Sequence, residues 1–421
     1  MTDARIIVEI GFVGPGSGTS LTLDDTSRGV LGTGTLAADG VWTDVTPYVV
    51  SVSTRRGATR ADGPILRYEA GTATIVLRND DRRFDPTNLD GPYVAAGDTQ
   101  VKPMRAVRVR AAWASATYPL WQGYADEWRV SYDGPNSSQV ALTCSDGFSV
   151  LASHDRGASV PAGGGEDTGA RVGRILDSVD WPDVDRVIAV GDSTVQETTL
   201  ADNALAELLL TVDSELGELY MDAQGRVTFR NRRGVVEDDR SATSQATFGD
   251  GGGGELPYAD VVVSYDAQSI YNRVSIARVG GTAQVAEDTA SQSAYLVRTY
   301  TRTDLLLESD SECADYAGYL LHQGRQPELR FASILLKPSR DAGLWPQALG
   351  REIGDRVTAV RRPPGGGDPI ERDVIVRGIE HEVVVDQEWR TRFVFQSASR
   401  LSFLVLDDAA LGALDDNALA Y

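Results

Sequence analysis

The chain carries its clearest structural signal in Ile65-Leu-Arg-Tyr-Glu-Ala-Gly-Thr-Ala-Thr-Ile-Val-Leu-Arg-Asn-Asp-Asp-Arg-Arg-Phe-Asp-Pro-Thr-Asn88. Within it, the apolar residues Ala73, Ile75 and Leu77 occupy every second position and alternate with more polar residues. Successive side chains of a β-strand point to opposite faces, so this spacing predicts a strand with one buried face. The threonine, isoleucine and valine residues of the segment suit a half-buried, pleated surface.

A charged corner follows this strand. Turn formers at positions 79–81 end the strand, and Asp85-Pro86 introduces a second turn. Phe84 is the large apolar side chain of the corner, so we expect it to anchor the corner. We predict an ion network at a subunit boundary, with these interaction candidates: Asp80, Asp81, Arg82, Arg83 and Phe84. Singly, exposed ion pairs contribute at most about 1 kcal/mol to stability.

Length and composition indicate a globular protein of several domains. A chain of 421 residues is longer than a domain with a single hydrophobic core usually is, so several domains are expected. The hydrophobic fraction of 42% is typical of a packed protein. A formal net charge of -21 argues against a DNA-gripping role, which needs clustered cations, and fits a surface past which DNA slides. The two cysteines, Cys144 and Cys313, exclude a disulfide framework and are consistent with assembly in a reducing cytoplasm. We expect neither a secretory signal nor a membrane-spanning segment.

Short strands punctuated by glycine, proline and aspartate recur along the chain and predict β-barrels that are closed or nearly closed. Between them, Thr168 is predicted to cap a first helix, and a second helix is predicted to start near Thr199, with Asp202 three residues on. A hairpin around residues 222–225 completes this small α+β unit. A third helix is predicted to begin with the capping box Ser309–Glu312.

The predicted fold class is therefore mainly β, with two β-barrel-type domains and a small α+β insertion. We expect four parts, which are an N-terminal barrel domain, the inserted α+β domain, a C-terminal β-rich domain with one helix, and a C-terminal docking segment. Their expected ranges are 1–152, 153–235, 236–400 and 401–421.

Several segments resemble the tail-tip or baseplate hub family, in particular minor tail proteins from long-tailed phages of actinobacteria. Among them are Tyr68–Asn88, Ala206–Arg232 and Glu352–Pro364. In that family the first segment belongs to the first β-barrel and the second to the inserted domain. Each pattern is degenerate, but their order and spacing together are fairly specific, and the resemblance spans most of the chain.

The resemblance implies a structural virion protein at the tail tip, made in the host cytoplasm. Members of this family form a ring of three that joins the distal tail ring to fibres or a spike and encloses the DNA exit channel. The implied partners are identical copies, a distal tail protein, the C-terminus of a tape measure protein, and tip fibre or spike proteins. DNA is expected to pass through the lumen without specific binding.

Two alternatives remain beside the hub. One is a distal tail ring protein, which is also structural but usually sixfold. The other is a tail-associated cell-wall hydrolase or carbohydrate-binding tail protein. Hubs with such an activity normally carry an appended catalytic domain, for which we expect no room after the last predicted strands.

The chain also contains an internal echo, because residues 23–37 and 406–420 share the template L-D-D-x-x-x-G-x-L-x-x-x-x-L-A. Spaced leucines with acidic turn starters suit a short segment that lies in a shallow groove. One hypothesis is that both are docking segments for a neighbouring subunit or a partner. The other is that they are capped turns covering the ends of two barrels. The candidate docking residues are Leu23, Asp24, Asp25, Leu406, Asp407, Asp408, Leu411, Leu414 and Leu419.

Signals for catalysis are weak. The three histidines, His154, His322 and His381, lack metal-ligand spacing, and no nucleophile elbow of the form G-x-S-x-G is present. A thiol pair of Cys144 with His154 is conceivable, but the position of Cys144 at the end of an apolar strand favours a packed, inert cysteine. We predict no enzyme, no catalytic metal and no cofactor.

Overall fold

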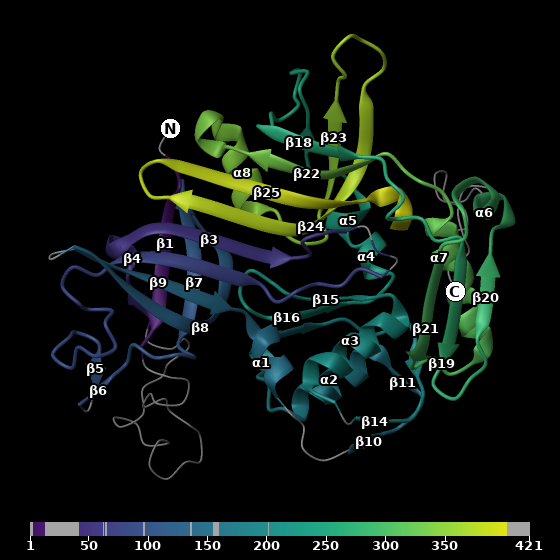
Figure 1. Cartoon of the computed structure of the whole chain (residues 1–421), viewed down its shortest axis with the longest axis horizontal. Coiled ribbons are helices and arrows are strands. Elements are labelled where there is room, and N and C mark those ends of the chain that lie inside the picture. Colours follow the sequence, from purple (N-terminus) through teal and green to yellow (C-terminus); the bar gives the residue numbers. More distant parts are fainter. Residues whose placement is uncertain are drawn as a thin grey trace.

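The computed structural model describes residues 3–12, 42–61, 63, 65–95, 97–134, 137–154, 160–200 and 202–401. The fold is mainly β, as the sequence predicted, and one large sheet dominates it (Figure 1). Within the described ranges this sheet has 13 strands, which are β1 Arg5–Gly11, β2 Thr43–Asp44, β3 Val49–Gly57, β4 Thr72–Arg78, β7 Ala106–Trp113, β8 Ala116–Gly134, β9 Ser137–Ser145, β17 Thr247–Phe248, β18 Asp260–Ser264, β22 Arg330–Leu336, β23 Arg356–Arg361, β24 Ile370–Val384 and β25 Glu388–Ser397.

The long strand β24 connects the two halves of this sheet. Along one edge, Ile370–Ile375 pair with β23 and Gly378–Val384 pair with β3, while β25 pairs along the opposite edge. The β24–β25 register shifts between Val376 and Gly378, so Arg377 lies in a bulge. Among the described residues the strand order is an open path from β18 to β2. Closure into two barrels therefore stays a prediction.

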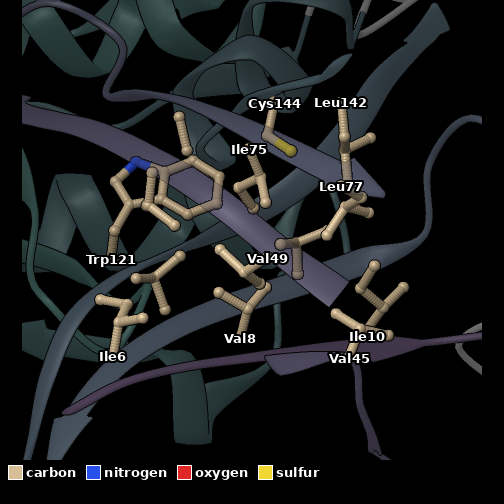
Figure 2. Close-up of a cluster of buried hydrophobic side chains, with 14 of the residues drawn as sticks. Ile6, Val8, Ile10, Val45, Val49, Ile75, Leu77, Trp121, Leu142 and Cys144 are labelled. Atoms are coloured by element: carbon tan, nitrogen blue, oxygen red, sulfur yellow. The ribbon is translucent and has the colours of Figure 1, made fainter. Parts of the chain in front are cut away.

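Two apolar cores lie along this sheet. The first is built from β1, β3, β4 and β7–β9, and the turn end of the β24–β25 hairpin adds Val383 and Trp389 to it. Figure 2 shows its side chains converging between the strands. Ala73, Ile75 and Leu77 all point into it, which confirms the alternation predicted from the sequence. The second core contains Phe248, Phe331, Phe393 and their neighbours on β22–β25.

The α+β unit follows β9 and has its own core. Its helices are α1 Gly147–Ser153, α2 Thr168–Asp177 and α3 Ala204–Glu215. Its strands are β12 Arg186–Ile188, β15 Glu218–Met221 and β16 Val227–Arg230, with the short pairs β10 Val160–Ala162 with β14 Thr198–Leu200, and β11 Glu166–Asp167 with β13 Thr194–Val195. The hairpin β15–β16 is confirmed where the sequence predicted it.

Two predicted caps in this unit are wrong. Asp167, not Thr168, caps α2, because its carboxylate accepts a hydrogen bond from the Ala170 backbone. Residues near Thr199 belong to β14 instead of a helix, and α3 begins after Asn203, whose side chain accepts from the Ala206 backbone. Both sites carry several adjacent capping residues, so the sequence alone did not select the one used.

The residues that follow β18 and precede β22 in the chain form a separate lobe, which is seen at the right of Figure 1. It combines β19 Arg273–Arg278, β20 Gln284–Glu287 and β21 Thr299–Leu305 with α6 Thr289–Tyr295 and α7 Asp310–Gly324. The capping box of Ser309 with Glu312 is confirmed at the start of α7. The remaining elements are β5 Val94–Ala95, β6 Asp98–Thr99, α4 Gly234–Glu237, α5 Asp239–Ala242, α8 Trp345–Gly350 and 3₁₀ turns at 46–48, 183–185, 338–340, 342–344 and 398–401.

Candidate functional site: the charged corner

The charged corner is held in place by Asn79, which is fully buried at the end of β4. Its Oδ1 accepts a hydrogen bond from the Phe84 backbone at 2.8 Å, and its Nδ2 donates to the Ser138 hydroxyl at 3.3 Å. The Asp80 carboxylate accepts from the Ser138 backbone at 3.1 Å. These bonds fix the corner against the start of β9, so its backbone is preorganised.

The ion pairs of the corner are formed within it. Arg83 Nε donates to Asp81 Oδ2 at 2.8 Å, and Arg82 Nε donates to Asp85 Oδ2 at 3.0 Å. The hydrogen bonds from Arg83 lower the pKa of Asp81 below its ordinary value. Arg82 has a φ of 60°, and its side chain is exposed. Asp80, Asp81 and Arg82 are thus the charged groups that the corner presents to solvent.

An aromatic base lies beneath these charges. Phe84 is fully buried, and its ring centroid lies 5.7 Å from that of Tyr48, 5.6 Å from that of Tyr93 and 6.3 Å from that of Trp128. The Arg83 guanidinium lies 3.8 Å from the centre of the Tyr48 ring, within the range of a cation–π contact. The corner is therefore a rigid charged surface on an apolar support. The sequence identified Phe84 but missed its three partners, of which Tyr48 and Trp128 are distant in the chain and Tyr93 lies nine residues after Phe84.

The two candidate docking segments lie outside the described residues, as do all nine of their candidate leucines and aspartates. The flanking residues are placed, however. Phe12, just before residues 13–41, stacks on Tyr93 with centroids 3.9 Å apart. Trp42, just after them, lies under Arg108 at 4.3 Å. Phe12 therefore packs against the aromatic base of the corner.

The thiol considered as a nucleophile is inert in this geometry. Cys144 is 2% exposed within the first core, and burial raises the pKa of its thiol well above the ordinary value. His154 is exposed after the end of α1. Burial lowers the pKa of His381 to about 3, so this ring stays neutral while its Nδ1 bonds to the Thr391 hydroxyl.

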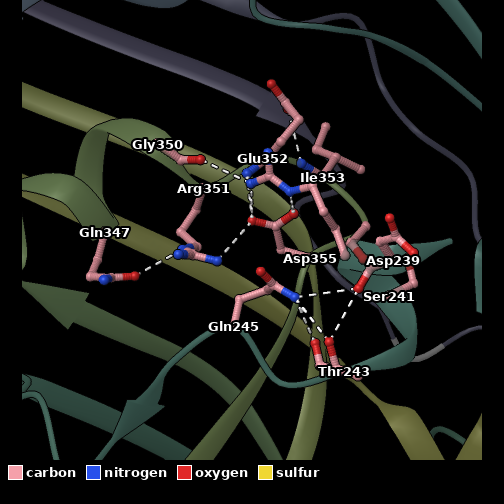
Figure 3. Close-up of polar contacts among 12 residues, drawn as sticks. Asp239, Ser241, Thr243, Gln245, Gln347, Gly350, Arg351, Glu352, Ile353 and Asp355 are labelled. Carbon is pink, nitrogen blue, oxygen red and sulfur yellow. Dashed lines mark hydrogen bonds and ion pairs between the residues drawn. The ribbon is translucent and has the colours of Figure 1, made fainter. Parts of the chain in front are cut away.

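A charged cleft of about 490 Å³ lies between the β15–β16 hairpin, α5 and the loop before β23. Ion pairs engage the carboxylates of Asp222, Asp238, Glu352 and Asp355, and Figure 3 shows those of Asp355. Asp355 accepts from Arg240 Nε at 2.6 Å and from Arg351 Nη1 at 3.3 Å. Over the described part of the chain, no group of three or more histidine, cysteine or acidic residues is placed to hold a metal, and no helix is long and apolar enough to cross a membrane. The ion pair of Arg240 with Asp355 connects α5 to the loop before β23.

Comparison with known proteins adds information on the fold. No protein-family model matches the chain, and no curated protein matches its sequence. The 43 kDa tail protein of prophage MuSo2 from Shewanella oneidensis superposes with a TM-score of 0.57 at 9% identity, over 95% of this chain and 98% of that one. The tail protein from Neisseria meningitidis MC58 gives a TM-score of 0.58 at 12% identity, over 94% and 96% of the two chains. The chain therefore shares the fold of two tail proteins along nearly its whole length.

Proposed function

We propose that this chain is a structural protein of a phage tail and that it forms the tail-tip hub ring of a long-tailed phage. The observation that carries the proposal is the likeness in fold to two tail proteins, which extends over at least 94% of each chain compared. Such coverage leaves little of either relative unmatched, so the likeness concerns a whole architecture and is not limited to one common domain. The tail tip and the ring are the finer parts of the proposal, and they rest on the resemblance of the sequence segments.

The charge balance supports a ring around a DNA channel. A formal net charge of -21 gives the chain little affinity for phosphate backbones, as a lumen that releases DNA requires. A closed ring of identical copies needs two different, complementary faces on each copy. The charged corner is our candidate for one of them, because its exposed acids and Arg82 stand on a rigid base.

The ring is proposed to contain three copies and to contact a distal tail protein, the C-terminus of a tape measure protein, and tip fibres or a spike. Permanent interfaces of this kind bury more than about 2,000 Å². DNA passes through without sequence-specific contacts in this proposal, and no enzymatic step is assigned to the chain.

The decisive experiment is averaged electron microscopy of the assembled protein, both purified and within tails labelled on this chain. Threefold symmetry at the tail tip is the expected result. Sixfold symmetry would identify a distal tail ring protein instead. A protein that stays monomeric and clears host cell walls in a zymogram would overturn the structural assignment.

A further inference from the structure

Several lobes of the molecule meet around one buried ion pair. Arg377 lies in the bulge of β24, and its guanidinium forms an ion pair with Glu218 at the start of β15. The side chains of both residues are at most 5% exposed. Gly57, opposite the bulge, has a φ of 86°, and a Cβ there would lie 2.3 Å from the Arg377 carbonyl oxygen. The sheet therefore brings Arg377 to this place through a close backbone approach that only glycine permits.

A small cavity of about 50 Å³ adjoins the pair. Its lining comes from separate stretches of the chain: Ile65 and Leu66, Leu216 to Glu218, Arg232, Val235 and Val236, the end of α7, and Arg377 with Gln396. The lining thus includes residues of the main sheet, the α+β unit and the lobe that contains α7.

One polar atom of Arg377 and one of Glu218 are not used by the hydrogen bonds of the pair. Arg377 Nε donates to Gln396 Oε1 at 2.9 Å, and its Nη1 donates to the Tyr68 hydroxyl at 3.3 Å. Arg377 Nη2 and Glu218 Oε2 are buried and have no hydrogen-bond partner within the described ranges. Glu218 Oε2 forms an ion pair with Arg230 Nη1 at 3.5 Å, but this contact is not a hydrogen bond.

One atom is a donor and the other is an acceptor, and both residues line the same cavity. Buried polar groups are almost always hydrogen-bonded, and one water needs about 10–15 Å³ of cavity volume and two to four polar partners. An anion would accept from Arg377 but could donate nothing to a carboxylate. Water can do both.

We propose that the cavity is a built-in hydration site, in which an ordered water accepts from Arg377 Nη2 and donates to Glu218 Oε2. The water completes the hydrogen bonding of an ion pair that joins the α+β unit to the main sheet. This inference does not depend on the proposed tail function, because it concerns the folded chain alone.

The first test is an experimental structure of the full chain at about 2 Å resolution, with a second crystal soaked in bromide. The expected result is a water within hydrogen-bonding distance, about 2.7–3.2 Å, of both atoms. An anomalous bromide peak in the cavity would show that the cavity binds an anion and not a water, and it would refute the proposal. An empty cavity, or side chains that bond directly to each other, would also refute the proposal.

A cavity-filling variant gives a second test. Val235→Ile adds one methylene beside the cavity, and Val262→Ile is the control because Val262 is exposed on β18. A hydrated site predicts that Val235→Ile lowers the thermal midpoint relative to the control and that the water peak disappears from its structure. A midpoint that is unchanged or raised would mean that the methylene fills a dry cavity, and it would contradict the proposal.

Discussion

Arg56 of β3 reaches Glu352, which lies just before β23, and the two residues are separated by 296 positions in the chain. Arg56 Nη1 and Glu352 Oε1 are 2.6 Å apart, while Arg56 Nε donates to the Leu120 carbonyl at 2.8 Å. The Arg56 side chain is only 4% exposed. This one side chain therefore ties the first half of the large sheet to the loop that leads into the second.

Replacing Arg56 by methionine should lower the free energy of unfolding by about 3 kcal/mol, because one partner of a largely buried pair is lost while Glu352 stays. The matched control is Arg129→Met, since Arg129 pairs with Glu127 at a site where both side chains are more than half exposed. The control should cost less than about 1 kcal/mol. Urea titration of the two variants measures the difference, and equal losses would mean that the Arg56 contact does not join the two halves.

The corner should depend on its aromatic base for stability. Phe84→Ala removes a fully buried ring that contacts three other aromatic residues, so it should cost about 3–5 kcal/mol. Phe84→Leu keeps most of the volume and should cost less than about 1.5 kcal/mol. Chemical denaturation followed by tryptophan fluorescence tests both variants. If Phe84→Ala unfolds at the wild-type midpoint, the ring is not the anchor of the corner.

The exposed charges of the corner should matter for assembly more than for folding. Asp80→Asn with Asp81→Asn removes two charges yet keeps an acceptor at each position, including the one that Ser138 uses. Stability should change by no more than about 1 kcal/mol. Ring formation should need about tenfold more protein if each interface loses about 1.4 kcal/mol. Mass photometry measures this, with Glu127→Gln as a surface control. If the variant forms rings at the same protein concentration as the wild type, the corner is not part of the proposed subunit boundary.

Local patterns predicted a large part of the fold. The alternation at 73–77, the β15–β16 hairpin and the capping box at Ser309 each depend on residues close in sequence, and each is confirmed. Phe84 was recognised for the same reason, since it is the large apolar group in a polar turn. Such signals reflect backbone geometry and burial of one face, which short stretches of sequence determine.

Contacts between residues that are far apart in the chain were not predicted from the sequence. Arg377 sits in the apolar run Val374–Ile379, and nothing nearby indicates that a bulge buries it against Glu218. β24 pairs with the nearby strand β23, but its pairing with β3 spans more than 300 residues, so the division of β24 between the two strands was not predicted. Two aromatic partners of Phe84, Tyr48 in a 3₁₀ turn and Trp128 in β8, are distant in sequence, and only the fold brings them to Phe84.

Stability should fall as the pH rises from about 4 to about 7, in part because of Asp146. Its carboxylate accepts from the Gly71 and Phe148 backbones, but burial raises its pKa to about 7. The unfolded chain loses this proton near pH 4 and the folded chain only near pH 7, so the native state binds more protons between these values. The stabilising contribution is complete below about pH 4 and is lost as the pH approaches 7. By linkage it amounts to no more than about 4 kcal/mol.

The variant Asp146→Asn should flatten the pH dependence of the unfolding free energy between pH 4.5 and 7.5. Glu215, whose pKa burial also raises to about 7, contributes with the same sign and should leave a residual slope. Denaturant titrations at four pH values measure the slope for the wild type and the variant. An unchanged slope would show that Asp146 is not the titrating group.

The C-terminal leucine–aspartate segment should affect assembly and leave folding unchanged. Removing residues 404–421 spares the described core, which continues to the 3₁₀ turn Ala398–Leu401. We therefore expect a wild-type thermal midpoint and fewer copies per tail when the truncated chain replaces the native one. A full-length variant with serine at Leu406, Leu411, Leu414 and Leu419 should behave in the same way, because it removes the apolar contacts but keeps the aspartates. Quantitative mass spectrometry of purified tails counts the copies. Normal incorporation of the truncated chain would favour the other hypothesis, in which the segment is a capped turn at the end of a domain.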